Sequence, residues 1–191
     1  MLNITANYLN STLGRLLTVI DLKNNEINEE KIDFKEMITT ILKNNSIHEG
    51  YDKIRFDIKI DENIGFKSDP TIINLILHNL MENSIKYYKN YEEADPFIML
   101  FIQVHKNKLQ INIIDNGIGI NKEHLNLFEI FSKSTHDSKA AGLGLYMIKT
   151  CVDKLGGSIH LIDNPNSWTE FLIEIPVLNK NKKEKKLVMT S

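Results

Sequence analysis

Three polar residues recur on one side of a segment with helical spacing in the middle of the chain. Asn79, Asn83 and Lys86 are separated by four and then three residues, so in an α-helix their side chains share one face. Amide oxygens are hard ligands, and together with a lysine they suit a hydrated Mg²⁺ and a polyphosphate. A solvated helix face is the alternative, and the stripe alone does not separate the two.

A second group of residues, 115–120, directly follows a run rich in β-forming residues. Gly117 and Gly119 allow the backbone to approach a ligand closely, and Asp115 can accept a hydrogen bond from an exocyclic amine. An ordinary turn is the alternative, because Asp-Asn-Gly is strong turn chemistry.

A third group pairs two glycines with the start of a helix. Gly142 and Gly144 precede a helical pattern, and the free N–H groups and dipole of a helix N-terminus favour phosphate. A lone Gly-x-Gly before a helix is a weak indication when taken by itself.

The segments around these groups predict an α+β fold with a helical prefix. Asp69 and Pro70 predict a helix start, and Lys106 with Asn107 predicts the turn of a hairpin. The polar stretch 23–30 is the expected domain boundary. Expected helices cover residues 2–22, 34–42, 70–89 and 145–155, and expected strands cover 54–60, 97–105, 108–115, 158–163 and 168–176.

Composition excludes several classes of protein. The 191 residues carry a formal net charge of -2, which gives no basic field for binding nucleic acid. Cys151 is the only cysteine, so neither an internal disulfide nor a cysteine cage for a metal can form. No apolar run approaches the length of a membrane span, and no signal peptide is recognisable, so we expect a cytoplasmic chain without direct membrane contact.

The order of the motifs carries more information than any one of them. NLMENSIKYY, DNGIGI, FEIF, GLGL and GGSI follow one another along the chain. This series resembles the five nucleotide-binding boxes of the histidine-kinase branch of the Bergerat-fold (GHKL) ATPases, over residues 32–177. The resemblance implies a two-layer α/β sandwich, with a mixed sheet packed on helices and an N-terminal helix from a dimerisation hairpin. It also implies a kinase that uses ATP and Mg²⁺.

The resemblance assigns roles to individual residues. Asn83 would ligate the Mg²⁺, Asn79 and Lys86 would lie near the phosphates, and Tyr87 would lie against the nucleotide. Asp115 would take the adenine amino group, and the phosphates would be held at the start of the last helix. The remaining nucleotide contacts would come from Gly117, Gly119 and Ile120 around the base and from Gly142, Leu143, Gly144 and Leu145 around the phosphates.

The segment 121–141 would be a lid over ATP, anchored by Phe128 and Phe131. Both arginines of the chain precede the motifs, so a lysine or histidine of the lid must supply any charge to the transferred phosphate. We expect Lys133 to do this in preference to His136 or Lys139. Together with Asn79 and Lys86, Lys133 forms the expected catalytic set.

The residue at position 79 limits the chemistry. Hydrolysing relatives carry a carboxylate four residues before the metal-binding asparagine, and here that residue is Asn79. Without that base, fast ATP hydrolysis is not expected, which suits a kinase. Asn79 and the lack of a second domain also disfavour a clamp like MutL or gyrase.

No histidine of the chain matches the family's phosphoacceptor motif. We therefore expect a fragment, with a partial dimerisation helix at 1–28, the kinase catalytic domain at 29–178 and a basic flexible tail at 179–191. Expected partners are a histidine-bearing dimerisation domain and a response-regulator receiver, in a full-length homodimer that can be membrane-anchored. The alternatives are a native short protein acting on a partner and a catalytically silent ATP-binding scaffold.

Overall fold

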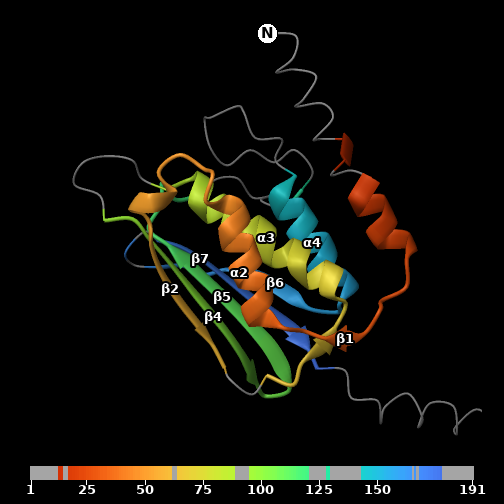
Figure 1. Cartoon of the computed structure of the whole chain (residues 1–191). Helices are drawn as coiled ribbons and strands as arrows, with labels where there is room; N and C mark the ends of the chain where they lie inside the picture. The colour runs from red at the N-terminus through yellow and green to blue at the C-terminus, as the bar shows by residue number, and fades with distance from the viewer. Residues whose placement is uncertain are drawn as a thin grey trace, which may run out of the picture.

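A five-stranded mixed sheet and a layer of helices on one of its faces form the body of the protein (Figure 1). The computed structural model describes residues 13–14, 17–61, 64–88, 95–120, 128–129, 143–164, 166 and 168–177. This architecture confirms the predicted α+β sandwich with a mixed sheet packed on helices.

The sheet has the strand order β2-β4-β5-β7-β6. Its first pair, β2 with β4, is parallel, and the other three pairs are antiparallel. Lys106 and Asn107, between β4 and β5, have φ values of 48° and 66°, as a tight hairpin turn requires. The strands are β2 (Arg55–Ile60), β4 (Phe97–His105), β5 (Lys108–Asp115), β6 (Ser158–Leu161) and β7 (Thr169–Pro176).

The helical layer consists of α2 (Phe34–Asn45), α3 (Pro70–Lys86) and α4 (Gly144–Lys154). Asp69 caps α3 by accepting hydrogen bonds from the backbone N–H groups of Thr71 and Ile72, and Pro70 begins the helix, as predicted. The helix ends at Lys86, earlier than the expected residue 89, because Tyr87 leaves the helix and its carbonyl accepts a hydrogen bond from Ile118.

The core lies between α3 and the inward face of the sheet. Ile73, Ile76 and Leu77 of α3 are fully buried, and so are Leu100 of β4 and Ile111 of β5. Alternate residues of β4 and β5 are buried, which is the pattern of strands with one face on a core. This packing holds α3 in a fixed position, with one flank toward α4.

Short elements that periodicity did not predict complete the described fold. β1 (Glu30–Lys31) pairs with β3 (Lys67–Ser68), and a 3₁₀ helix, η1 (Tyr51–Lys53), precedes β2. Elements of two or three residues are too short for a periodic signal. The predicted boundary between residues 28 and 29 stays a prediction, although the backbone N–H of Asn28 donates to the carboxylate of Asp69.

Residues 17–24 are helical and lie beside α4 (Figure 1). Val19 and Leu22 are buried, whereas Leu17 and Ile20 are exposed. The ammonium group of Lys23 lies 3.3 Å from the hydroxyl oxygen of Tyr146 in α4. Among the described residues, no helix is long and apolar enough to cross a membrane.

Candidate functional site

The amide groups of Asn79 and Asn83 in α3 face the first residue of α4. A Cβ atom built on Gly144 would lie 3.4 Å from both amide atoms of Asn83 and 3.6 Å from Oδ1 of Asn79. Asn79 is only 4% exposed, and its Nδ2 donates to the carbonyl of Leu75. The asparagine pair is therefore not a solvated helix face, because it lies against Gly144, which is more than 60 residues away in the sequence.

The start of α4 differs from the starts of the other two helices of this layer. Asp33 caps α2 and Asp69 caps α3, each through its carboxylate, whereas α4 begins after Leu143, which makes no side-chain cap. Leu143 is itself buried. An anion at this helix start would meet N–H groups and the positive end of the helix dipole, so the start of α4 suits a phosphate.

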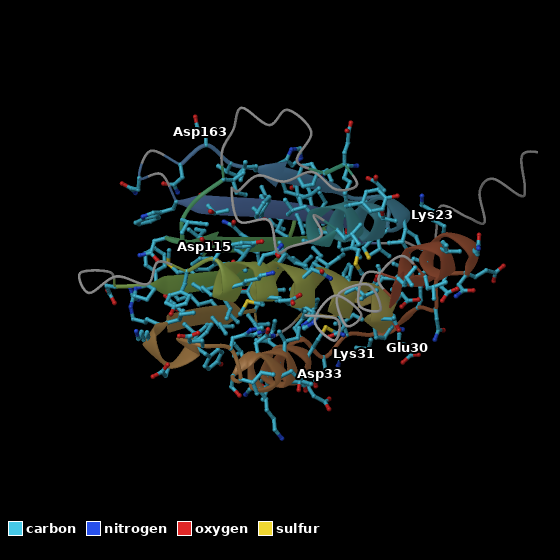
Figure 2. All side chains as sticks on the ribbon, turned by 90° about the horizontal axis from the view of Figure 1, so that it is seen from above. Lys23, Glu30, Lys31, Asp33, Asp115 and Asp163 are labelled. Carbon is cyan, nitrogen blue, oxygen red and sulfur yellow. The ribbon has the colours of Figure 1, made fainter. Side chains whose placement is uncertain are left out.

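Asp115 is the last residue of β5, and each oxygen of its carboxylate accepts a hydrogen bond. The hydroxyl of Ser84 donates to Oδ2 at 3.0 Å, and the backbone N–H of Gly117 donates to Oδ1 at 3.0 Å. The side chain lies in the interior of the molecule, on the opposite side from Lys23 in the view of Figure 2. A carboxylate in a fixed orientation can select a ligand that offers a donor at one position.

The backbone after Asp115 approaches the end of α3 very closely. A Cβ atom on Gly117 would lie 2.5 Å from the carbonyl oxygen of Tyr87, and Ile118 donates its N–H to the same oxygen at 3.0 Å. Gly119 has a φ of 80°, a conformation that favours glycine. Ile120 packs, partly buried, against the core. The glycines of this segment thus let it pass beside α3.

Lys86 and Tyr87 contact each other at the end of α3. The Lys86 ammonium group lies 5.5 Å from the centre of the Tyr87 ring, within the range of a cation–π interaction. Lys86 is exposed, and Tyr87 is half-buried. Tyr87 is beside the segment that follows Asp115, through its carbonyl, and Lys86 is one turn from Asn83 along the helix.

Helix α3 connects the two halves of the site. Asn79 and Tyr87 are eight residues apart, which corresponds to about 12 Å along a helix. This length matches the span from the base to the outer phosphates of a nucleoside triphosphate. The polar flank of α3 can therefore hold the phosphates beside α4 and the base beside Asp115.

Several predicted residues lie outside the described part of the chain. These are Lys133, His136, Lys139, Phe131 and Gly142. Phe128 is described and packs, partly buried, against the core, and Leu145 does the same from α4. The assignment of a lid cation stays a prediction.

Two residues beside the site were not selected from the sequence. Ser84 bonds Asp115, and Asn116 accepts a hydrogen bond from the N–H of Phe97 and donates one to the carbonyl of Asp95. The only sequence signal for Ser84 is its place one residue after Asn83. Its partner is 31 residues away in the chain, which no local pattern reveals.

The asparagine amides of α3 offer oxygen ligands to a metal ion that is bound together with a phosphate. Within the described ranges, no group of three or more His, Cys, Asp or Glu side chains is placed to hold a metal ion. The Asn83 amide, adjacent to the start of α4, offers a neutral oxygen of the type that Mg²⁺ accepts along with phosphates. The residues present therefore fit a magnesium ion that is bound together with a nucleotide.

Comparison with known proteins agrees with this geometry. Residues 68–179 match the model of the family described as histidine kinase-, DNA gyrase B- and HSP90-like ATPase. The sensor protein RprX of Bacteroides fragilis is 30% identical over 172 residues, which cover 86% of this chain and 33% of that protein. The sensor histidine kinase YvrG of Bacillus subtilis is 31% identical over 175 residues, which cover 87% of this chain and 29% of that protein.

Solved structures share the fold. The histidine kinase AdeS of Acinetobacter baumannii superposes with a TM-score of 0.74 at 24% identity, over 91% of this chain and 81% of that chain. The catalytic domain of the histidine kinase ThkA gives a TM-score of 0.64 at 24% identity, over 80% and 97% of the two chains. This chain spans about a third of the length of RprX and of YvrG. The family match and the shared fold confirm the predicted resemblance, and the chain belongs to the histidine kinase-, DNA gyrase B- and HSP90-like ATPases.

Proposed function

We propose that this chain is the ATP-binding catalytic domain of a sensor histidine kinase in a two-component system. It moves the γ-phosphoryl group of ATP to a histidine imidazole on a dimerisation domain. The P–O bond to the departing ADP breaks and a P–N bond to the imidazole forms. A response-regulator receiver then takes the phosphoryl group, and in the full-length protein two copies associate through the dimerisation domain.

One observation carries this proposal: α3 brings Asn79 and Asn83 against Gly144 and, at its other end, Tyr87 against Gly117. Phosphoryl transfer depends on position and charge rather than on covalent chemistry by the protein. Asn83 would bind Mg²⁺, and the start of α4 would bind the phosphates. Lys86 and a cationic residue of segment 121–141, Lys133 in preference to His136 or Lys139, would supply positive charge.

The residue at position 79 supports transfer over hydrolysis. A general base must accept a proton from water, and a neutral amide does not do this at ordinary pH. The Asn79 amide also donates its Nδ2 to Leu75, which directs its oxygen toward Gly144. ATP bound here would therefore keep its γ-phosphoryl group until an acceptor arrives.

The direct test supplies the missing acceptor. The chain is mixed with separately expressed histidine-bearing dimerisation hairpins from several sensor kinases and with ATP labelled at the γ-phosphate. We expect a label on at least one hairpin that is lost in acid and kept in base, no label on the chain alone, and slow release of free phosphate. Asn83→Ala serves as the inactive control.

The competing function is a catalytically silent scaffold that binds ATP. It would be supported if the chain bound Mg-ATP in calorimetry while no hairpin became labelled. Labelling of a hairpin by the wild-type chain, together with its loss in Asn83→Ala, would exclude the scaffold. Failure to bind any nucleotide would overturn both functions.

A further inference from the structure

Ser84 bonds to another element of the fold, whereas the short polar side chains of Thr39, Asn45 and Asn79 bond within their own helices. Thr39, Asn45 and Asn79 each donate to the carbonyl four residues earlier in their own helix. Such local bonding is the usual choice of short polar side chains within a helix. Ser84 instead donates across to β5, to Oδ2 of Asp115.

Both partners of this hydrogen bond are buried. Ser84 is 6% exposed and Asp115 is 7% exposed, and their oxygens are 3.0 Å apart. In a buried environment, little water is present to replace a lost donor. Removing the Ser84 hydroxyl therefore takes away a donor to the carboxylate that water does not readily replace.

Two hydrogen bonds, one to each oxygen, restrict how the Asp115 carboxylate is turned. The terminal torsion of an aspartate is otherwise broad, because it joins an sp³ to an sp² carbon. Gly117 holds Oδ1 through its backbone N–H, and Ser84 holds Oδ2. The hydrogen bond from the Gly117 backbone cannot be removed by changing a side chain. The hydrogen bond from Ser84 can, so a substitution at Ser84 tests how the carboxylate is oriented.

We propose that Ser84 is a positioning residue for base selection, which orients the Asp115 carboxylate toward the exocyclic amine of adenine. The inference rests on the proposed function, because it assigns the base to Asp115. Ser84 acts through Asp115 and is not assigned a contact with the nucleotide. The adjacent Asn83 is assigned to the Mg²⁺ and the phosphates. Two consecutive residues of α3 therefore act at opposite ends of ATP, Asn83 at the phosphates and Ser84 at the base.

The test compares two nucleotides that differ only in the amine. ATP and purine riboside triphosphate, which has hydrogen in place of the amino group, are titrated with Mg²⁺ by calorimetry. The wild-type chain, Ser84→Ala and Ser84→Thr are compared. Ser68→Ala is the matched control, because Ser68 is also a buried serine but lies in β3, before the start of α3.

We expect Ser84→Ala to weaken ATP binding about five- to tenfold, a size typical of one lost hydrogen bond, with the binding of purine riboside triphosphate unchanged. Ser84→Thr keeps a hydroxyl and should restore the preference for ATP, and Ser68→Ala should retain it. A structural role would weaken both nucleotides equally, and that result would overturn the inference.

The same titrations separate this inference from the proposed function. Wild-type protein that prefers ATP, with the preference lost in Asp115→Ala but kept in Ser84→Ala, would overturn the role of Ser84 alone. Wild-type protein that binds both nucleotides equally, or neither, would overturn the adenine assignment itself. Loss of the preference in both Ser84→Ala and Asp115→Ala would support the inference.

Discussion

Gly144, the first residue of α4, faces Asn83 of α3 so closely that a Cβ atom on Gly144 would lie 3.4 Å from both amide atoms of Asn83. The asparagines of α3 and the glycine that begins α4 are remote in the sequence but adjacent in the fold, so they line the same part of the site. The contact explains why a glycine suits the first position of α4: a side chain there would fill the space between the helix start and the two asparagines.

Gly144→Ala should therefore weaken the binding of Mg-ATP without lowering the stability of the fold. Alanine favours helices over glycine by about 1 kcal/mol, so the melting temperature should stay the same or rise. The added methyl group should nevertheless lower Mg-ATP affinity at least fivefold, because it fills the space beside Asn83. Gly65→Ala, where a Cβ would meet no atom within 4 Å, is the control for calorimetry and thermal melting. Unchanged affinity in Gly144→Ala would contradict the phosphate assignment.

Asn83→Ala should remove the dependence of ATP binding on Mg²⁺ while the chain stays folded. Asn83 is half-buried and contributes an amide to the site rather than a large apolar surface to the core. Calorimetry with and without Mg²⁺ measures the dependence, and circular dichroism checks the fold. Asn74→Ala, at an exposed position of the same helix, should keep the dependence. An unfolded Asn83→Ala chain would show that Asn83 is structural.

Gly117→Ala should destabilise the protein. A Cβ there would be 2.5 Å from the carbonyl oxygen of Tyr87 and 2.8 Å from Oδ1 of Asp115, so the backbone must shift. Overpacking of this kind costs about 1 to 3 kcal/mol, which urea unfolding would detect. Stability equal to wild type would mean that residues 117–118 can move away from α3 without penalty.

Asp69→Ala should destabilise the protein more than Asp33→Ala. Asp69 accepts hydrogen bonds from Thr71, Ile72 and Asn28, whereas Asp33 accepts one from Glu36. Loss of a helix cap costs about 1 kcal/mol, and Asp69 additionally holds the segment before β1. Urea unfolding measures the free energy of unfolding of the two variants. An equal decrease in both would mean that the hydrogen bond from Asn28 to Asp69 does not contribute to stability.

Cys151 should be unreactive in the folded protein. Burial, and to a smaller extent the negative charge of Asp69, raises the pKa of its thiol from 9.0 to about 12. Between pH 9 and 12 the folded chain keeps a proton that the unfolded chain loses, so this thiol makes stability fall as pH rises through that range. Thiol labelling at pH 8 should follow unfolding, and Mg-ATP should slow it. Fast labelling in native buffer would contradict the burial.

Much of the fold was predictable because its signals are local. Asp69 and Pro70 mark the start of α3 through their own chemistry, and the alternation of apolar residues predicts β4 and β5. Lys106 and Asn107 occupy the turn between those strands as expected. Each of these signals depends on neighbours a few residues away, which a sequence displays directly.

The residue types of the site and their order can be recognised without a structure: the amides of Asn79 and Asn83, the carboxylate of Asp115 and the glycines that follow. Three relationships become visible only in the fold. Asn79 is buried against Gly144, the Tyr87 carbonyl accepts a hydrogen bond from Ile118 at the end of α3, and the Ser84 hydroxyl donates to Asp115. They are hidden in the sequence because helical spacing specifies only which side chains share a face. It does not specify what that face meets, because this depends on how α3 and α4 pack on the sheet.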